Sequence, residues 1–466
     1  MDLLIKNGTV VTSKEVKQAD IYIKNGKIKS IKNNGLFREE KNGSIKIFDA
    51  TNMLVMPGGV DVHTHMEMPF MGTFSTDDFN TGTIAAAMGG TTSIIDYAVP
   101  GRWDSPRRTL DKWHKKAEGK AIIDYGFHMA IVPPVDRMLK DFDYLVESGV
   151  TSIKCFLAYK NSLMVNDIDL YRILERAREH KILVCTHAEN GEIIDYLTKN
   201  FLKEGKKDPI FHAYSRPPGL EDESVSRVIK LSGMTKTPVY FVHLSSKGAV
   251  REVKRAKKDK QKVFAETCPQ YVIFSEHKYH SGNFEAAKYV MSPPLRKYKH
   301  CSYIKKAIKE GTIDVIATDH CPFNFNKEKR RGLKDFTKIP NGMPGIETRM
   351  PVMFNEMVVK KGMDLSRFVE LNCTRPAKIF GLEQKGDIKE GKDADIALWN
   401  PDLIWKIKQE NLHENVDYTP FEDYVVTGKP VTVISRGDII VDNGELQAEA
   451  GRGKYISRKI SSPAYE

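Results

Sequence analysis

The sequence has few cysteines, and their spacing is not that of a metal-binding or disulfide framework. The 466 residues include six cysteines, none of which forms a Cys-x-x-Cys pair. Such pairs mark zinc ribbons and redox sites, and dense cysteine pairing marks small secreted domains. We therefore expect no disulfide framework, and we expect the several cysteines that lie in apolar strand-like runs to be reduced and packed in the core.

Long apolar runs are also missing. The opening residues 1–6 contain only a short apolar stretch, and no later run approaches the roughly 20 apolar residues of a membrane-spanning helix. We therefore expect a cytoplasmic protein with no signal peptide and no membrane partner.

The chain has fewer acidic than basic residues. Its 61 Asp and Glu residues are outnumbered by 72 Lys and Arg residues, which gives a net charge of +11. One explanation is nucleic-acid binding. The basic residues are instead spread along helical stretches such as residues 251–262, with no RNA-binding signature and no basic tail. We interpret the charge as a solvated, lysine-rich surface and expect no nucleic-acid partner.

Both ends of the chain contain short β-like runs. Residues 3–5 and 21–23 are followed by Asn7-Gly8 and Asn25-Gly26, and Asn-Gly is typical of hairpin turns. Similar runs return at residues 394–399, 431–435 and 439–441. We expect residues 1–52 and 385–450 to form one small β-sandwich domain, followed by an extended polar tail at residues 451–466.

Between the ends, eight apolar runs alternate with helix-like segments. The runs are residues 53–56, leading into 57–65, and then 92–99, 122–131, 152–158, 182–186, 239–242, 263–266 and 314–317. Eight strands alternating with helices predict an α/β fold, a (β/α)8 TIM barrel over residues 53–384. A doubly wound sheet is the alternative, because periodicity alone cannot prove closure.

Polar side chains follow the predicted strands at their carboxyl ends, where the loops of such a barrel build the active site. They are His63 and His65 on the first strand, Lys154 on the fourth, His187 on the fifth, His243 on the sixth and Asp319 on the eighth. A single strand-end histidine is more often structural, and Lys154 could simply pair with Asp319. Together, however, imidazoles and a carboxylate on one rim predict a site for a divalent metal such as zinc.

Lys154 indicates how many metals this site holds. Two divalent cations would repel an ammonium group, so the lysine must be deprotonated or converted to an anion. We hypothesise a carbamate, formed with carbon dioxide, that bridges two metals. His63, His65 and Asp319 would hold one metal, and His187 and His243 the other.

Four segments make a family resemblance recognisable. They are residues 57–65 (PGGVDVHTH), 154–161 (KCFLAYKN), 318–323 (TDHCPF) and 341–349 (NGMPGIETR). In order and over nearly the whole chain, the sequence resembles the dihydropyrimidinase/hydantoinase family of cyclic amidohydrolases. The resemblance implies a dinuclear zinc centre bridged by N6-carboxylated Lys154, a barrel with a terminal β-sandwich, and a homotetramer or homodimer.

The resemblance also implies roles for residues around the metals. Tyr159 would hydrogen-bond the substrate carbonyl oxygen, and main-chain groups of Ser292 and Asn341 would hold the cyclic amide. Met66, Phe156 and Leu163 would line the pocket for the exocyclic substituent. Leu163 is compatible with small or aliphatic substituents. By the same analogy, the tail reaches a neighbouring subunit.

These observations favour a hydrolase that opens dihydropyrimidines or 5-substituted hydantoins to N-carbamoyl amino acids, with Asp319 as general base and acid. Three alternatives stay open. Allantoinases and dihydroorotases share the metal pattern but act on rings with a ureido or carboxylate group. Mononuclear deaminases of similar fold would leave Lys154 without a purpose. Collapsin response mediator proteins are non-catalytic adaptors that have lost metal ligands, whereas all six ligand positions are filled here.

Overall fold

Eight parallel strands form the centre of the computed structural model, which describes residues 2–33, 35, 45–282 and 284–465. They are β6 (Gly59–Thr64), β9 (Thr91–Ala98), β10 (Asp124–Ala130), β11 (Ser152–Phe156), β12 (Leu183–His187), β13 (Val239–Phe241), β14 (Val263–Thr267) and β15 (Val315–Ile316). An isolated parallel bridge between Thr64 and His320 joins the two edges of this sheet. The strands therefore close into a barrel, which confirms the predicted (β/α)8 fold over the doubly wound alternative.

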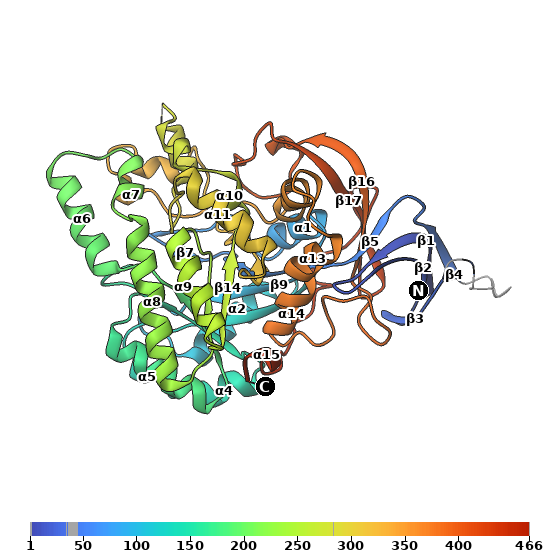
Figure 1. The fold of residues 1–466 in the computed structure, drawn as a ribbon, viewed down its shortest axis with the longest axis horizontal. Coiled ribbons are helices and arrows are strands. Elements are labelled where there is room, and N and C mark those ends of the chain that lie inside the picture. Colours follow the sequence, from blue (N-terminus) through green and yellow to red (C-terminus); the bar gives the residue numbers. More distant parts are fainter. Residues whose placement is uncertain (1, 34, 36–44, 283, 466) are drawn as a thin grey trace.

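Helices surround the barrel (Figure 1). They are α1 (Thr81–Met88), α2 (Pro106–Ala117), α3 (Val135–Leu139), α4 (Phe142–Glu147), α5 (Asp167–Glu179), α6 (Gly191–Lys203), α7 (Ile210–Tyr214), α8 (Pro218–Thr235), α9 (Lys247–Lys258), α10 (Pro269–Ile273), α11 (Tyr298–Lys309), α12 (Arg349–Met353), α13 (Leu365–Val369) and α14 (Arg375–Ile379). Ser105, Asn166, Asn190 and Ser246 begin α2, α5, α6 and α9, since each side chain accepts a main-chain N–H of the first turn.

Side chains on the strands alternate between the barrel interior and the surrounding helices. Ile153 and Val184 pack in the core under the helices, whereas Cys185 belongs to the interior cluster with Leu183 and Phe264. All six cysteines are free and buried, including those predicted to pack in the core. The apolar interior explains why polar groups gather at the carboxyl ends of the strands, where the loops open to solvent.

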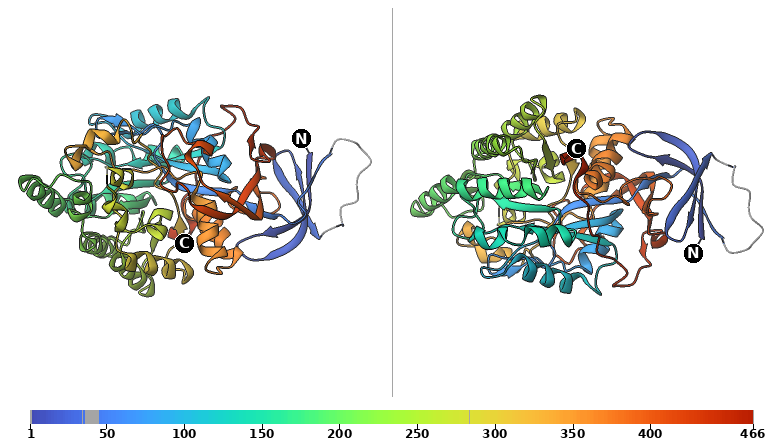
Figure 2. Two further views of the ribbon diagram at one scale, coloured as in Figure 1. Left: turned by 90° about the horizontal axis from the view of Figure 1, so that it is seen from above. Right: turned by 90° about the horizontal axis from the view of Figure 1, so that it is seen from below.

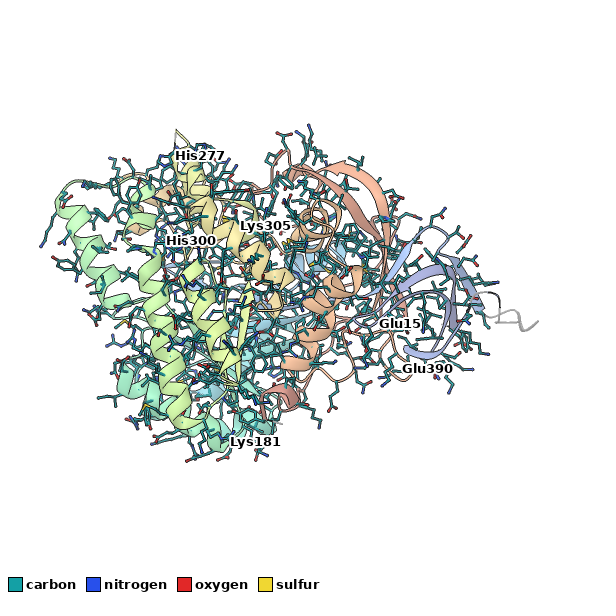
Figure 3. The ribbon with its side chains drawn as sticks, viewed as in Figure 1. Glu15, Lys181, His277, His300, Lys305 and Glu390 are labelled. Carbon is teal, nitrogen blue, oxygen red and sulfur yellow. The ribbon has the colours of Figure 1, made fainter. Side chains whose placement is uncertain are left out.

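The loops at the two ends of the barrel lie far apart. His277 lies in a 3₁₀ turn, η1 (Glu276–His280), after β14, and Lys181 precedes β12. Figure 3 shows His277 at the top and Lys181 at the bottom of the view. Within the described residues, no helix is both long enough and apolar enough to cross a membrane.

Strands from both chain ends form a second, nine-stranded sheet beside the barrel (Figure 1). They are β1 (Asp2–Val11), β2 (Val16–Lys24), β3 (Lys27–Asn33), β4 (Ile45–Asp49), β5 (Leu54–Pro57), β16 (Ile396–Lys406), β17 (Val425–Ser435), β18 (Asp438–Asp442) and β19 (Glu445–Leu446). β5 pairs with β1 on one side and with β16 on the other. Buried side chains from both ends share one core, so the predicted terminal β domain is confirmed.

Two local strand predictions were wrong. The run at residues 53–56 lies in β5 of the terminal sheet, and the histidines belong instead to β6 (Gly59–Thr64). The chain crosses between the sheets at Gly58, where a Cβ would lie 2.1 Å from the Thr92 side chain. Apolar periodicity cannot tell which of two sheets a strand joins, and the exact domain boundaries stay predictions.

The second wrong prediction concerns Asn7-Gly8. This pair forms a bulge within β1, where Asn7 has φ 64° and the pairing register shifts between Ile5 and Gly8. Asn25-Gly26 does form the predicted two-residue turn, with φ values of 52° and 74°. The positive φ at both positions matches the turn type that such hairpins prefer.

The C-terminal tail lies against the barrel of its own chain. Tyr455 donates to the Ser148 carbonyl at 2.8 Å, and the buried Arg458 donates to Ser152 Oγ at 2.8 Å. Figure 2 shows the C-terminus next to the barrel. Contact of the tail with a neighbouring subunit stays a prediction.

A buried ion cluster joins the barrel to the terminal sheet. The Lys385 Nζ lies 2.5 Å from Asp124, 3.0 Å from Asp393 and 2.8 Å from Asp395. Asp124 begins β10 of the barrel, whereas the two other aspartates precede β16.

We expect Lys385→Met to lower the free energy of unfolding by about 3–5 kcal/mol, because it leaves buried carboxylates without a counter-charge. Urea denaturation measures this loss. Lys389→Met, at an exposed neighbouring position, should change it by less than about 0.5 kcal/mol. Equal stability of the two variants would contradict a role of the cluster in joining the domains.

Candidate metal centre and active site

Three predicted ligands converge where β6 and β15 end. Nε2 of His63 lies 3.0 Å from Oδ1 of Asp319, and Nε2 of His65 lies 3.1 Å from the same atom. One ligand atom from each residue lies within 4.8 Å of the other two. With Zn–N bonds of about 2.0–2.1 Å, neighbouring ligand atoms of a tetrahedral site are about 3.3 Å apart. The three side chains therefore suit one divalent ion.

Two further histidines lie beside this group. Nδ1 of His187, at the end of β12, is 2.9 Å from Nε2 of His243, which follows β13. The rings of His243 and His63 stack with their centres 5.4 Å apart. All four predicted histidines thus lie on one rim of the barrel.

Carboxylates hold the outer nitrogens of two of these histidines. Nδ1 of His63 lies 2.7 Å from Glu266 Oε1, and Nε2 of His187 lies 2.9 Å from Glu189 Oε2. Metal-binding histidines usually donate their second ring N–H to such a partner, which leaves the inner nitrogen free for the metal. The donor arrangement therefore fits a metal centre.

The protonation states fit as well. Burial lowers the pKa of His65 to about 4 and also lowers the pKa of His187 and of His243. Burial would raise the pKa of Asp319, but the imidazoles of His63 and His65 hold it well below its usual range. Neutral imidazoles at His65, His187 and His243 and an ionised Asp319 are the forms that bind metal ions. Burial and the charge of Lys154 would lower the pKa of His63, but the carboxylates of Glu266 and Asp319 outweigh them, so this pKa is instead raised. Among the described residues, the buried Nδ1 atoms of His65 and His243 have no hydrogen-bond partner.

Lys154 lies inside this group and is 1% exposed. Its Nζ is 2.9 Å from His63 Nε2 and 4.3 Å from the centre of the Tyr97 ring. In the described part of the chain, no ion pair joins Lys154 to Asp319 or to another carboxylate. The alternative that Lys154 simply pairs with Asp319 is therefore not observed. Burial lowers its pKa, which favours the neutral amine.

Three residues of the site have a left-handed backbone: Tyr159 with φ 65°, His243 with φ 40° and Asp319 with φ 55°. Such conformations cost of the order of 1–3 kcal/mol for residues other than glycine and concentrate at functional sites. Each of the three follows shortly after a barrel strand, so the tight turn directs its side chain over the rim.

A cavity of about 520 Å³ opens above the predicted metal ligands. The predicted residues that line it are His65, Lys154, Phe156, Tyr159, Leu163, His187, His243, Ser292, Asp319 and Asn341. Asn341 Nδ2 donates to Ser292 Oγ at 3.0 Å. Burial raises the pKa of Tyr159. The charge of Arg216 and the hydrogen bonds to Ser292 and Asn341 act in the opposite direction, but the net shift of the pKa is upward. The Tyr159 hydroxyl therefore keeps its proton at neutral pH and can act as a donor.

Of the residues predicted to line the substituent pocket, Met66 does not reach the cavity. Met66 is fully buried. Its sulfur lies so close to Gly82 of α1 that a Cβ added to this glycine would be only 2.3 Å from the sulfur. Phe70 instead lines the cavity and packs edge-on against Tyr159, with ring centres 5.6 Å apart. The reason is the direction of the Met66 side chain, which points under α1.

Glu266 and Glu189 were missed by the sequence analysis. Glu266 accepts the main-chain N–H of His243 at 3.0 Å and the Tyr240 hydroxyl at 2.9 Å, in addition to its contact with His63. It stands at the end of an apolar strand, as the predicted ligands do, and that position was the available signal.

Glu266→Gln should weaken metal binding about 10–100-fold, because the partner that orients His63 loses its charge. Competition with a chromophoric chelator measures the affinity. Glu175→Gln, at an exposed position of α5, is the matched control. Unchanged affinity in Glu266→Gln protein would show that this carboxylate does not act on the metal.

Comparisons with known proteins show the family of the chain. The chain matches the amidohydrolase family over residues 54–440. It is 44% identical to a D-hydantoinase of Geobacillus stearothermophilus over 460 residues, which are 98% of this chain and 97% of that protein. It is 38% identical to a dihydropyrimidinase of Dictyostelium discoideum, covering 100% of this chain and 92% of that one. The crystal structure of a dihydropyrimidinase from Brevibacillus agri has a TM-score of 0.96 at 44% identity, covering 99% of this chain and 100% of that chain.

The amidohydrolase family implies a dinuclear metal site, and His63, His65 and Asp319 form a group able to hold one ion. The family resemblance found in the sequence is thus confirmed over nearly the full length. The chain belongs to the dihydropyrimidinase/D-hydantoinase family of cyclic amidohydrolases.

Proposed function

We propose that the chain hydrolyses the endocyclic amide bond of hydantoins and dihydropyrimidines with two divalent metal ions and releases N-carbamoyl amino acids. The observation that supports this most is the convergence of four histidines, Asp319 and Lys154 on one rim beneath a cavity of about 520 Å³. A cavity of this volume suits a small cyclic molecule.

In this proposal, His63, His65 and Asp319 would hold one ion, and His187 and His243 would hold the other. Lys154, carboxylated on Nζ, would serve both ions as a shared ligand. Its support is the position of the buried amine, 2.9 Å from His63 Nε2 and without a carboxylate partner in the described residues. Zinc suits a site of imidazole and carboxylate ligands. When bound, two such ions lower the pKa of a shared water and polarise a carbonyl group.

Tyr159 stabilises the negative charge that develops on the attacked carbonyl oxygen. Its hydroxyl faces the cavity and keeps its proton at neutral pH. A donor aimed at a developing oxyanion contributes about 2.7–4 kcal/mol to the stability of the transition state.

Asp319 transfers the proton. Its carboxylate lines the cavity and is 15% exposed, so it can accept a proton from the attacking water. It can then pass the proton to the ring nitrogen that leaves, as general base and then general acid.

Ser292 and Asn341 hold the ring amide through their main-chain groups, and Phe156 and Leu163 face its exocyclic substituent. The aliphatic Leu163 suits small or aliphatic substituents rather than aromatic ones. Measuring kcat/KM for 5-methyl- and 5-phenylhydantoin tests this preference.

A substrate panel tests the proposed function. Ring opening of dihydrouracil, hydantoin, allantoin and dihydroorotate is followed in the ultraviolet with the metal-loaded enzyme. We expect turnover of dihydrouracil or hydantoin and little or none of the other two. Preferred turnover of allantoin or dihydroorotate would assign the alternative activity, and no turnover of any ring would favour a non-catalytic role.

We also propose a homotetramer, or a homodimer, in the cytoplasm, as the family resemblance implies. Light scattering on the eluting peak of a gel-filtration column gives the mass directly. A mass of one chain would contradict the proposed assembly.

A further inference from the structure

Lys329 is a fully buried lysine that contacts main-chain carbonyls rather than a carboxylate. It begins a short 3₁₀ turn, η3 (Lys329–Gly332), and is 0% exposed. Its Nζ donates to the carbonyls of Val290 at 2.9 Å, Pro340 at 3.0 Å and Gly342 at 2.7 Å. The three carbonyls match the three donors that an ammonium group can offer. No ion pair involves Lys329 within the described residues, although buried lysines are usually paired.

The three carbonyls belong to the two loops that carry Ser292 and Asn341. Val290 precedes Ser292, and Pro340 and Gly342 flank Asn341 on both sides. The loops also contact each other directly, since the Gly342 N–H donates to the Val290 carbonyl at 3.0 Å. Lys329 therefore joins the two loops, although it does not itself line the cavity that Ser292 and Asn341 line.

Other buried groups hold the rest of the Ser292 loop. His212 Nε2 lies 2.8 Å from the Met291 carbonyl, and the Tyr271 hydroxyl donates to the Pro293 carbonyl at 2.7 Å. In contrast, within the described residues no hydrogen bond of the protein engages a main-chain N–H or carbonyl of Ser292 or Asn341. The neighbouring carbonyls are thus fixed, while these main-chain groups stay available to a ligand.

The Asn341 loop also lies close to the metal ligands. Gly342 has φ 153°, and a Cβ there would lie 2.2 Å from the Cys321 carbonyl oxygen. Cys321 follows Asp319 by two residues and lines the same cavity. A shift of this loop would therefore change the distance between the ring-binding groups and the metal centre.

We propose that Lys329 is a positioning residue of the active site, which fixes the spacing of the Ser292 and Asn341 loops so that both engage one ring amide. This inference rests on the proposed function, because that function assigns ring binding to the two loops. Lys329 itself touches neither the substrate nor the metals.

The test compares Lys329→Met, which removes all three donors at similar length, with Lys329→Gln, which keeps two N–H groups. We expect KM for the best ring of the panel to rise about tenfold or more in Lys329→Met protein and less in Lys329→Gln protein, with kcat changed less than KM. Metal content should stay at the wild-type level.

Lys257→Met is the matched control. Lys257 also donates to a main-chain carbonyl, that of Thr312 at 2.8 Å, and pairs with Asp314, but it does not line the cavity. Its replacement should lower stability without raising KM, which separates a general structural effect from positioning.

Hydrogen–deuterium exchange gives a second readout that needs no substrate. The Gly342 amide and the peptides around Ser292 should exchange faster in Lys329→Met protein than in wild type or in Lys257→Met protein. If the wild-type enzyme hydrolyses none of the four cyclic substrates, the proposed function fails. The exchange measurement still tests whether Lys329 fixes the spacing of the two loops.

Two outcomes would overturn the inference. Folded Lys329→Met protein with unchanged KM and unchanged exchange would show that the loops hold their spacing without the lysine. Failure of both Lys329 variants to fold would make the residue a general determinant of the fold.

Discussion

Lys154→Ala protein is expected to bind little metal and to lose at least about 10³-fold in turnover, roughly 4 kcal/mol of transition-state stabilisation. In the proposed centre, the carboxylated lysine is the one protein group shared by both ions. Alanine removes this bridge and leaves the histidines and Asp319 with only part of the ligand set. Elemental analysis of the purified protein measures the metal content, and the ring-opening assay measures turnover.

Rescue makes this test specific. A short carboxylic acid can enter the space left by the lysine side chain and supply bridging oxygens, so adding one should restore part of the metal content and activity. Lys254→Ala is the control, because Lys254 is paired with Glu310 on the surface at 2.9 Å and should leave both quantities unchanged. Full metal occupancy of Lys154→Ala protein without added acid would rule out the bridging role.

Tyr159→Phe is expected to lower kcat about 10²–10³-fold while both metals stay bound, since the substitution removes one donor to the developing oxyanion. The ring remains and keeps its packing against Phe70. The loss should therefore appear in kcat more than in stability or in metal content.

Tyr196→Phe provides the comparison for this effect. Tyr196 lies on α6 and is 61% exposed, so its hydroxyl should not influence turnover. Near wild-type kcat in Tyr159→Phe protein would remove Tyr159 from the mechanism and would leave the metals as the sole stabilisers of the oxyanion.

The convergence of the candidate metal ligands was predictable from the sequence because parallel strands impose a simple rule. All carboxyl ends of a barrel meet at one rim, so His63, His187, His243 and Asp319 could be brought together without knowledge of any contact. The barrel itself was predictable for the same reason, as apolar runs and helix-like segments alternate along the chain.

Features that depend on side-chain direction or on distant pairing were not predictable. The run that became β5 has the composition of a buried strand in either sheet, and only its pairing with β1 and β16 decides between them. Met66 follows the ligand pair directly, yet its side chain packs against Gly82 rather than toward the cavity. The apolar periodicity of the sequence indicates that a residue is buried, but it does not indicate which residues the side chain contacts.

Charged residues in the interior were the hardest to interpret. Lys329 begins a run of three basic residues with Arg330 and Arg331, a pattern typical of an exposed, solvated segment. Its burial follows from three carbonyls contributed by two loops that are brought together only in the fold. Glu266 carried a better signal, because it ends a barrel strand as the ligands do.

Metal titration of the metal-free enzyme tests the central claim most directly. Protein stripped by a chelator is titrated with Zn²⁺ in the presence of bicarbonate, and turnover of the preferred ring is plotted against ions bound per chain. The proposed centre predicts that turnover reaches its plateau at two ions per chain. A plateau at one ion, or full turnover in the stripped protein, would contradict a two-metal cyclic amidohydrolase.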